Sequence, residues 1–230
     1  METKKHLNAP TCVQDLINEL TSLTWSTSWE CVHIQIEQLL KDCWFNRHTL
    51  FCSLREFIAS RACTLTVTSE LHSWMLYDPG GWILKLNQFK PDVRVGRASE
   101  GIHNHMRPLT TLTLGGWYAQ DFYYPDHVYA DGEKYGALYC SPGPTTHPGY
   151  VYTVGPDVFH ALNDFAEGTL TLVVYGLVQR DHITRFNIVK GVAELWRRHD
   201  TAKRTLFDQL KMAESLADRR HYEISDQSYR

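Results

Sequence analysis

The chain has 230 residues, of which 43% are hydrophobic and 21% are charged, a composition typical of a globular protein with a sizeable core. Its formal net charge of −3 gives no electrostatic basis for binding nucleic acid or an anionic membrane. No stretch approaches the roughly 18 apolar residues that a membrane-spanning helix needs. No apolar segment of the secretory type follows the polar residues 1–6. We therefore expect a cytoplasmic protein.

Residues 1–63 show apolar side chains at helical spacing and predict an N-terminal helical layer. The first such set is Val32, Ile36, Leu39, Leu40 and Cys43, and the second is Leu50, Leu54, Phe57 and Ile58. Five of the six cysteines also lie in this region, at spacings that match no zinc motif: Cys12, Cys31, Cys43, Cys52 and Cys63. In a reducing compartment we expect them to be buried free thiols, with disulfides or a second metal site as alternatives.

From residue 64 to residue 180 the pattern changes to strand-like segments separated by glycine, proline and Asn/Asp clusters. A strong turn signal, residues 78–81, separates the first two segments. This rhythm predicts an antiparallel β-sandwich or small barrel. The expected strands are residues 64–69, 82–89, 109–118, 135–140, 150–154 and 169–178.

After Arg180 the apolar spacing again indicates a helix. The predicted stripe runs through Phe186, Val189, Ala193 and Trp196 and continues through Leu206, Leu210 and Ala213. We expect residues 181–230 to form a C-terminal helix and a polar, frayed tail. The fold class is therefore α+β, with one domain over residues 1–230.

Three histidines are the candidate metal ligands. His103 and His105 are one residue apart, so on a strand both side chains would lie on the same face. His160 follows a glycine-rich turn further along the chain. A third imidazole from a neighbouring strand would complete a facial three-nitrogen site for a transition metal, with other coordination positions open.

These histidines stand within two sequence patterns that resemble the motifs of the cupin superfamily. The first is His103-Asn104-His105 followed by Gly116, and the second runs through Gly149, residues 155–157, His160 and Asn163. The resemblance covers roughly residues 82–178 and implies an antiparallel β-barrel of the double-stranded β-helix type. Leu109 or Thr110 stands where such motifs usually carry a glutamate. Residues 117–148 form a longer insert between the motifs than small cupins have.

The absence of the glutamate makes the predicted site similar to that of the three-histidine thiol dioxygenases. This resemblance implies Fe(II), O₂ as co-substrate and a small polar metabolite, of the amino acid or thiol class, that chelates the metal. It also implies that Tyr175 is a catalytic acid or a hydrogen-bond donor to bound oxygen. The family's cross-linking cysteine is Thr110 here, and of its Ser-x-His-x-Tyr series only a hydroxyl and the tyrosine are present, so a thiol substrate does not follow.

An arginine that binds the substrate carboxylate is also implied by the resemblance, and Lys85, Arg94 and Arg97 are candidates for this role. Arg107 lies two positions after His105 and has two interpretations, a substrate-carboxylate anchor and a rim salt bridge.

Other polar residues in this region have structural interpretations. His147 lies in the insert and is interpreted as a solvated loop residue, with fallback ligand as the alternative, and His127 is also assigned to a solvated loop. Asp157 and Asn163 are interpreted as turn residues.

Other functions remain open from the sequence. A redox-neutral, metal-dependent cupin lyase, isomerase or hydrolase would use Zn²⁺, Ni²⁺ or Mn²⁺ as a Lewis acid, and a non-catalytic cupin would only bind a metabolite. Purely structural histidines would bind no metal. The expected partner is a small molecule, and because barrel edge strands need covering, a homodimer is a further expectation.

Overall fold

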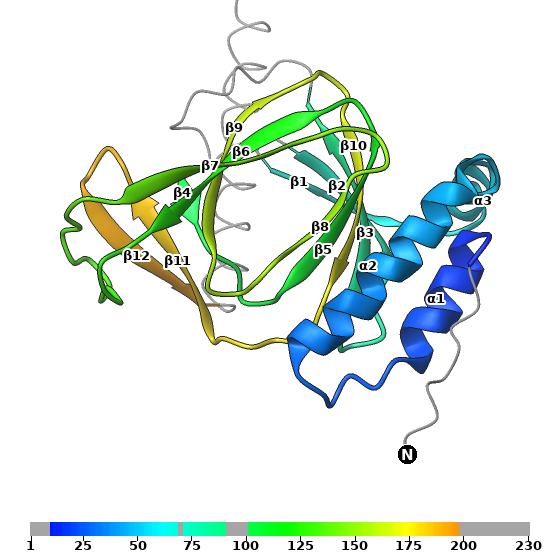
Figure 1. The fold of residues 1–230 in the computed structure, drawn as a ribbon, viewed down its shortest axis with the longest axis horizontal. Coiled ribbons are helices and arrows are strands. Elements are labelled where there is room, and N and C mark those ends of the chain that lie inside the picture. Colours follow the sequence, from blue (N-terminus) through cyan, green and yellow to red (C-terminus); the bar gives the residue numbers. More distant parts are fainter. Residues whose placement is uncertain (1–9, 69–70, 91–100, 198–230) are drawn as a thin grey trace, which may run out of the picture.

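The computed structural model describes residues 10–68, 71–90 and 101–197, which contain three helices and two antiparallel β-sheets (Figure 1). The helices are α1 (Val13–Ser22), α2 (Trp29–Phe45) and α3 (Arg47–Ser60). Side chains cap the first two helices, since Cys12 accepts from the backbone of Asp15 and Ser28 from that of Cys31. Within these ranges no helix combines the length and apolarity that crossing a bilayer requires.

Each sheet contains six strands, and every pairing is antiparallel. The first sheet has the order β1-β2-β3-β10-β5-β8, made of Thr64–Val67, Leu71–Tyr77, Ile83–Phe89, Leu170–Tyr175, Leu109–Gly115 and Val151–Val154. The second has the order β12-β11-β4-β9-β6-β7, made of Val192–Arg197, His182–Asn187, Ile102–His103, Phe159–Phe165, Tyr118–Tyr124 and Tyr139–Thr146. The strand order crosses over repeatedly along the chain, as in a jelly-roll sandwich.

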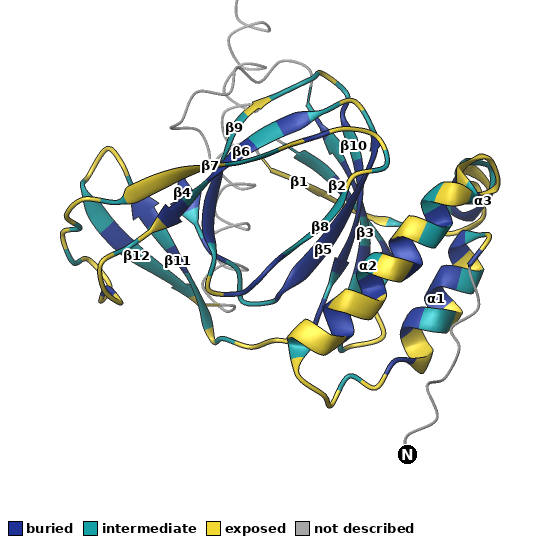
Figure 2. Ribbon diagram, viewed as in Figure 1, coloured by how far each residue is buried: buried dark blue, intermediate teal, exposed yellow. Residues whose placement is uncertain are grey.

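The largest core lies between the helices and one face of the first sheet. Leu84, Leu112 and Leu172 of this sheet are fully buried against the apolar stripes of the helices. Figure 2 shows the buried faces of α1 and α2 toward the sheet and their exposed faces outward. Burying a leucine of this kind stabilises the fold by about 1.5–3 kcal/mol. The helices thus cover the outer face of the first sheet, and its other face is directed toward the second sheet.

A chain of polar side chains also fastens α2 to this sheet. His33 Nδ1 lies 2.6 Å from Thr110 Oγ1, Thr110 Oγ1 lies 2.8 Å from Thr153 Oγ1, and Thr153 donates to Glu37 Oε1 at 2.8 Å. Burial lowers the pKa of His33 to about 4, so its imidazole is neutral at neutral pH. The chain therefore joins two successive turns of α2 to the outer faces of β5 and β8.

Some of the strands were predicted from the sequence and others were not. Strands β1, β3, β5, β7, β8 and β10 overlap the expected segments, although β7 begins at Tyr139 and extends to Thr146. Strands β2, β4, β6 and β9 were not predicted. Strands β6 and β7 both fall within the insert of residues 117–148, which is therefore largely part of the second sheet.

The expected C-terminal helix is wrong for the residues that the structure describes. Residues 182–197 form the β11–β12 hairpin, in which Phe186 and Ala193 pair across the strands and are fully buried. Val189, expected on the apolar stripe, is 94% exposed in the connecting turn. The continuation through Leu206, Leu210 and Ala213 lies outside the described residues.

None of the six cysteines forms a disulfide, as expected. Their burial differs from the expectation, because only Cys43 is buried, whereas Cys31 is exposed. Burial raises the pKa of the Cys43 thiol to about 12.

Candidate metal centre

The structure brings His103, His105 and His160 together at one place in the second sheet. His103 on β4 and His160 on β9 are directly paired across these strands, and His105 follows β4 by two residues. The ring centroids lie 4.9–5.0 Å apart in all three pairs. One nitrogen from each ring lies within 4.8 Å of the others, and the Nε2 atoms of His105 and His160 are 2.7 Å apart.

The local backbone differs from the regular strand that the alternating histidines predicted. Strand β4 contains only Ile102 and His103, so His105 lies beyond it. Between the two histidines, Asn104 is fully buried and bonds twice to Thr184 of β11. The Asn104 backbone N–H donates to the Thr184 carbonyl at 3.2 Å, and Asn104 Oδ1 accepts from the Thr184 N–H at 2.7 Å. Asn104 therefore holds the segment that carries both histidines, a role that the sequence analysis missed.

The outer nitrogens of two of the rings have carbonyl partners. His103 Nδ1 donates to the Gly101 backbone oxygen at 3.2 Å, and His160 Nδ1 donates to Gln120 Oε1 at 3.0 Å. Since a carbonyl oxygen can only accept, these contacts assign the proton to Nδ1 and leave a lone pair on Nε2. Such outer contacts orient histidine ligands in metal sites.

Burial keeps His105 and His160 neutral. Burial, with a smaller contribution from His103, lowers the pKa of His160 to about 3. Burial also holds the pKa of His105 well below its ordinary value, and the two neighbouring imidazoles lower it further. Neutral imidazoles are the form that binds a metal ion.

The donor set fits a divalent transition metal. If His105 and His160 both turn Nε2 lone pairs toward each other at 2.7 Å, a cation relieves their repulsion, whereas without one His105 must supply an N–H. Imidazole nitrogens suit iron, nickel, copper and zinc. Among the residues described, no carboxylate or thiolate joins the three histidines.

The structure also shows which way the two residues at the usual glutamate position face. Leu109 packs with Val154 and Val173 on the inner face of the first sheet. Thr110 points to the other face, where it contacts His33 and Thr153. The residue directed to the interior at this position is therefore apolar.

Tyr175, Lys85 and Arg107 lie near the segment that follows His105. Tyr175 packs against the cluster of Leu109, and the Lys85 ammonium lies 5.2 Å from the centre of the Tyr175 ring. Burial lowers the pKa of Lys85, the Asp78 carboxylate raises it and Arg107 lowers it. Among the described residues no carboxylate lies within ion-pair distance of Lys85.

Arg107 is in a bend and not in a regular strand, so strand alternation does not relate its side chain to that of His105. Its Nη1 donates to the backbone oxygens of Gly81 and Gly176, the second at 2.8 Å. Arg107 therefore ties the segment after His105 to the end of β10 and to the turn before β3.

Three of the remaining sequence candidates, His147, Asp157 and Asn163, are described by the structure, and none of them belongs to the histidine cluster. His147 is exposed in the loop between β7 and β8, as expected for a solvated residue. Asp157 is in a turn, where it forms an ion pair with Arg180. Asn163 is in β9 and not in a turn, so that prediction is wrong. Arg94 and Arg97 lie outside the described residues.

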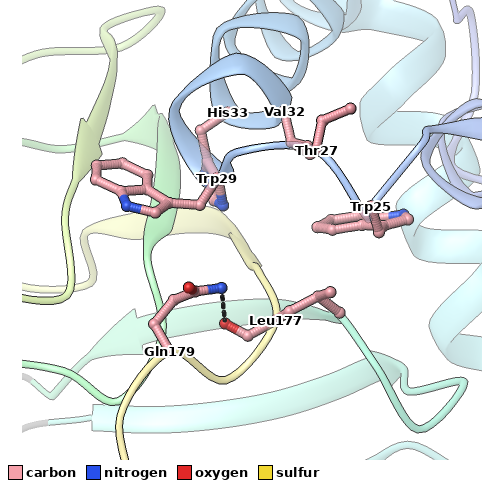
Figure 3. Close-up of a pocket in the computed structure, with 7 residues that line it drawn as sticks. All are labelled: Trp25, Thr27, Trp29, Val32, His33, Leu177 and Gln179. Carbon is pink, nitrogen blue, oxygen red and sulfur yellow. Dashed lines mark hydrogen bonds between the residues drawn. The ribbon is translucent and has the colours of Figure 1, made fainter.

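A separate pocket opens between the start of α2 and the segment after β10 (Figure 3). Trp25 and Trp29 form two of its sides, Leu177 and Gln179 lie opposite α2, and Thr27, Val32 and His33 complete the lining. None of the three clustered histidines lines it. The convergent polar chemistry of the described residues is therefore at the histidines and not in this pocket.

Comparison with known proteins gives weak structural likenesses. No protein-family model matches the chain, and no curated protein does. Among solved structures, KdgF from Halomonas sp. has a TM-score of 0.35 and 11% identity over 54% of this chain and 94% of that chain. An oxalate decarboxylase variant from Bacillus subtilis has a TM-score of 0.34 and 12% identity over 51% of this chain and 28% of that chain.

A cupin superfamily protein from Desulfitobacterium hafniense has a TM-score of 0.31 and 14% identity over 50% of this chain and 83% of that chain. What supports the cupin resemblance is the chain itself, with its two facing antiparallel sheets and its three-histidine cluster.

Proposed function

We propose that His103, His105 and His160 hold a single iron(II) ion and that the protein is a mononuclear non-haem iron oxygenase. The observation that carries this proposal is the convergence of three buried or half-buried imidazoles, with two Nε2 atoms 2.7 Å apart. Three nitrogen donors on one side of an octahedral ion leave three adjacent positions open. When bound, ferrous iron supplies a centre for chelating a small substrate together with O₂.

The proposed substrate is a small polar metabolite of the amino acid or thiol class. Lys85 offers a positive charge on the inner face of the first sheet, where it lies beside the Tyr175 ring. Because no carboxylate of the described residues pairs with this partly buried ammonium, an anionic group on the ligand is favoured there. Lys85 is thus the better candidate for the anchor, because Nη1 of Arg107 is engaged by two backbone carbonyls.

Tyr175 is proposed to donate a hydrogen bond, or a proton, to the reacting oxygen atoms. Tyr175 is the last residue of β10 and pairs with Leu109 of β5, so a regular strand holds it. Leu109 lies four residues after His105 in the sequence. Tyr175 packs against the apolar cluster of Leu109, Val154 and Val173, which limits the access of water on that side.

Metal content tests the ligand set. Elemental analysis of the purified protein, reconstituted anaerobically with Fe²⁺, should find about one iron per chain. His103→Ala, His105→Ala and His160→Ala should each lose most of it. His147→Ala, an exposed histidine outside the cluster, is the matched control and should retain the parent content. Equal metal content in all four variants would remove the basis of the proposal.

Oxygen uptake tests the reaction class. The iron-loaded protein is incubated with a panel of small amino acids and thiols while dissolved O₂ is followed. Substrate-dependent uptake, lost in His160→Ala, supports the oxygenase. Turnover that continues under strict anaerobiosis would instead identify a redox-neutral lyase or isomerase. Tight binding of a panel compound without turnover, with each of Fe²⁺, Zn²⁺, Ni²⁺ and Mn²⁺, would identify a binding protein.

A further inference from the structure

The side chain of Gln120 forms a hydrogen bond with the imidazole of His160. Gln120 is on β6, beside the strand β9 that carries His160, and it is 1% exposed. Its Oε1 accepts from His160 Nδ1 at 3.0 Å. We infer that Gln120 is a positioning residue that selects the metal-binding tautomer of His160, an inference that rests on the proposed metal site.

An irregularity in the sheet aims Gln120 at the histidine. The pairing of β6 with β9 shifts between Ala119 and Gln120, so that Ala119 pairs with Asp164 but Gln120 pairs with Leu162. Asn163 is the extra residue of this bulge. Bulges of this kind redirect side chains and are frequent next to functional sites. Without the shift, the side chains of β6 beyond Ala119 would be one residue out of their present register with His160.

Close packing holds Gln120 in this position. Gly143 of β7 lies against it, since a Cβ at residue 143 would be 2.6 Å from the Gln120 backbone oxygen and 3.2 Å from its Cγ. Gln120 therefore has little freedom to move away from the imidazole.

The chemistry of the contact makes it directional. The amide oxygen of Gln120 can only accept, so it favours the imidazole tautomer with the proton on Nδ1. This tautomer places the lone pair on Nε2, the atom that lies 2.7 Å from His105 Nε2. If the amide were rotated, its NH₂ group would favour the opposite tautomer, whose Nε2–H cannot bind a metal ion.

Two substitutions separate this role from simple packing. Gln120→Leu keeps the approximate volume and removes the acceptor, whereas Gln120→Glu retains an acceptor. Thr113→Val is the matched control, because Thr113 of β5 is fully buried and its Oγ1 has no hydrogen-bond partner among the described residues. The dissociation constant for Co²⁺ is measured by chelator competition and by the visible absorption of the bound ion. The tautomer of His160 is measured by ¹⁵N NMR of the metal-free protein.

We expect Gln120→Leu to weaken Co²⁺ binding about 10- to 100-fold, to change the Co²⁺ spectrum and to give a mixture of His160 tautomers. Gln120→Glu should restore the parent spectrum and tautomer, and Thr113→Val should behave as the parent. Unchanged affinity in Gln120→Leu, or a parent His160 protonated at Nε2, overturns the inference. A parent protein that binds no Co²⁺ overturns the proposed function, and the NMR measurement then still decides whether Gln120 sets the tautomer.

Discussion

The buried imidazole of His33 should make the fold sensitive to acid, independently of the metal centre. His33 is 1% exposed, and its Nδ1 is engaged by Thr110. Burial lowers its pKa from 6.5 to about 4. We compare the free energy of unfolding of the metal-free parent and of metal-free His33→Leu at about pH 7 and at about pH 5.

The sign and size follow from proton linkage. As the pH falls below 6.5, His33 in the unfolded chain takes up a proton, whereas the folded protein excludes that proton until the pH approaches 4. The stabilising contribution is therefore present above the ordinary pKa and is lost as the pH falls. Each pH unit costs about 1.36 kcal/mol, so about 1.5 units below the ordinary pKa cost about 2 kcal/mol.

Urea unfolding at both pH values measures the effect. Other buried histidines contribute equally to both proteins and cancel. We expect the parent to lose about 2 kcal/mol more free energy of unfolding than His33→Leu does on acidification. His147→Leu, at an exposed histidine, should lose as much as the parent. If the parent and His33→Leu lose the same amount, His33 is not kept neutral by burial and the reasoning fails.

Three further predictions concern stability and the surface. Gly176→Ala should destabilise the protein by about 1–3 kcal/mol in urea unfolding, because a Cβ would lie 2.5 Å from Nε2 of His33 and 2.9 Å from Pro108 Cγ; an unchanged midpoint would contradict this close approach. Leu112→Ala in the main core should cost about 2–5 kcal/mol by the same assay, whereas Ile34→Ala, at a 67% exposed position, should cost little. The pKa of His127 is raised, chiefly by its hydrogen bond to Glu133, so the His127–Glu133 contact is complete below the ordinary pKa and is lost as the pH rises through the raised value. Limited proteolysis of the 126–136 loop should therefore be faster at about pH 8 than at about pH 6. A pH-independent rate in the parent, or the same pH dependence in His127→Ala, would refute this.

The histidine cluster was accessible from the sequence because its ligands lie in recognisable spacing. His103 and His105 are adjacent enough to be recognised as a pair, and the turn before His160 marks the second segment. Their convergence requires β4 and β9 to pair, which local spacing does not determine. The resemblance to known motifs supplied that long-range information, and the geometry agrees with it.

The partners of the histidines were not accessible in the same way. Gln120 reaches His160 through a shift in register between β6 and β9, and such a bulge leaves no glycine or proline signal at this position. Asn104 holds its segment through two bonds to Thr184, a residue 80 positions away in the sequence. Both roles depend on tertiary contacts that a single sequence does not show.

The C-terminal hairpin shows how a helical pattern can mislead. Phe186 and Ala193 are seven residues apart, which is two helical turns, but they also face each other across a hairpin. The signal that distinguishes the alternatives is Gly191, whose φ of +67° closes the turn after Lys190. The alternation within residues 182–187, where Thr184 and Phe186 are buried, was the second sign of a strand.

The pairing of β4 with β9 consists of the single residue pair His103 and His160, so very little backbone bonding joins these strands. An ion bound by both side chains and by His105 would cross-link β4, the shortest strand of the sheet, to β9. Ligand binding adds about 2.7 kcal/mol to stability when the free ion is at about 100 times its dissociation constant. The lifetime of the folded protein in a cell would then depend on the supply of the metal. When the ion is scarce, the β4–β9 pairing would open more often and become accessible to proteases.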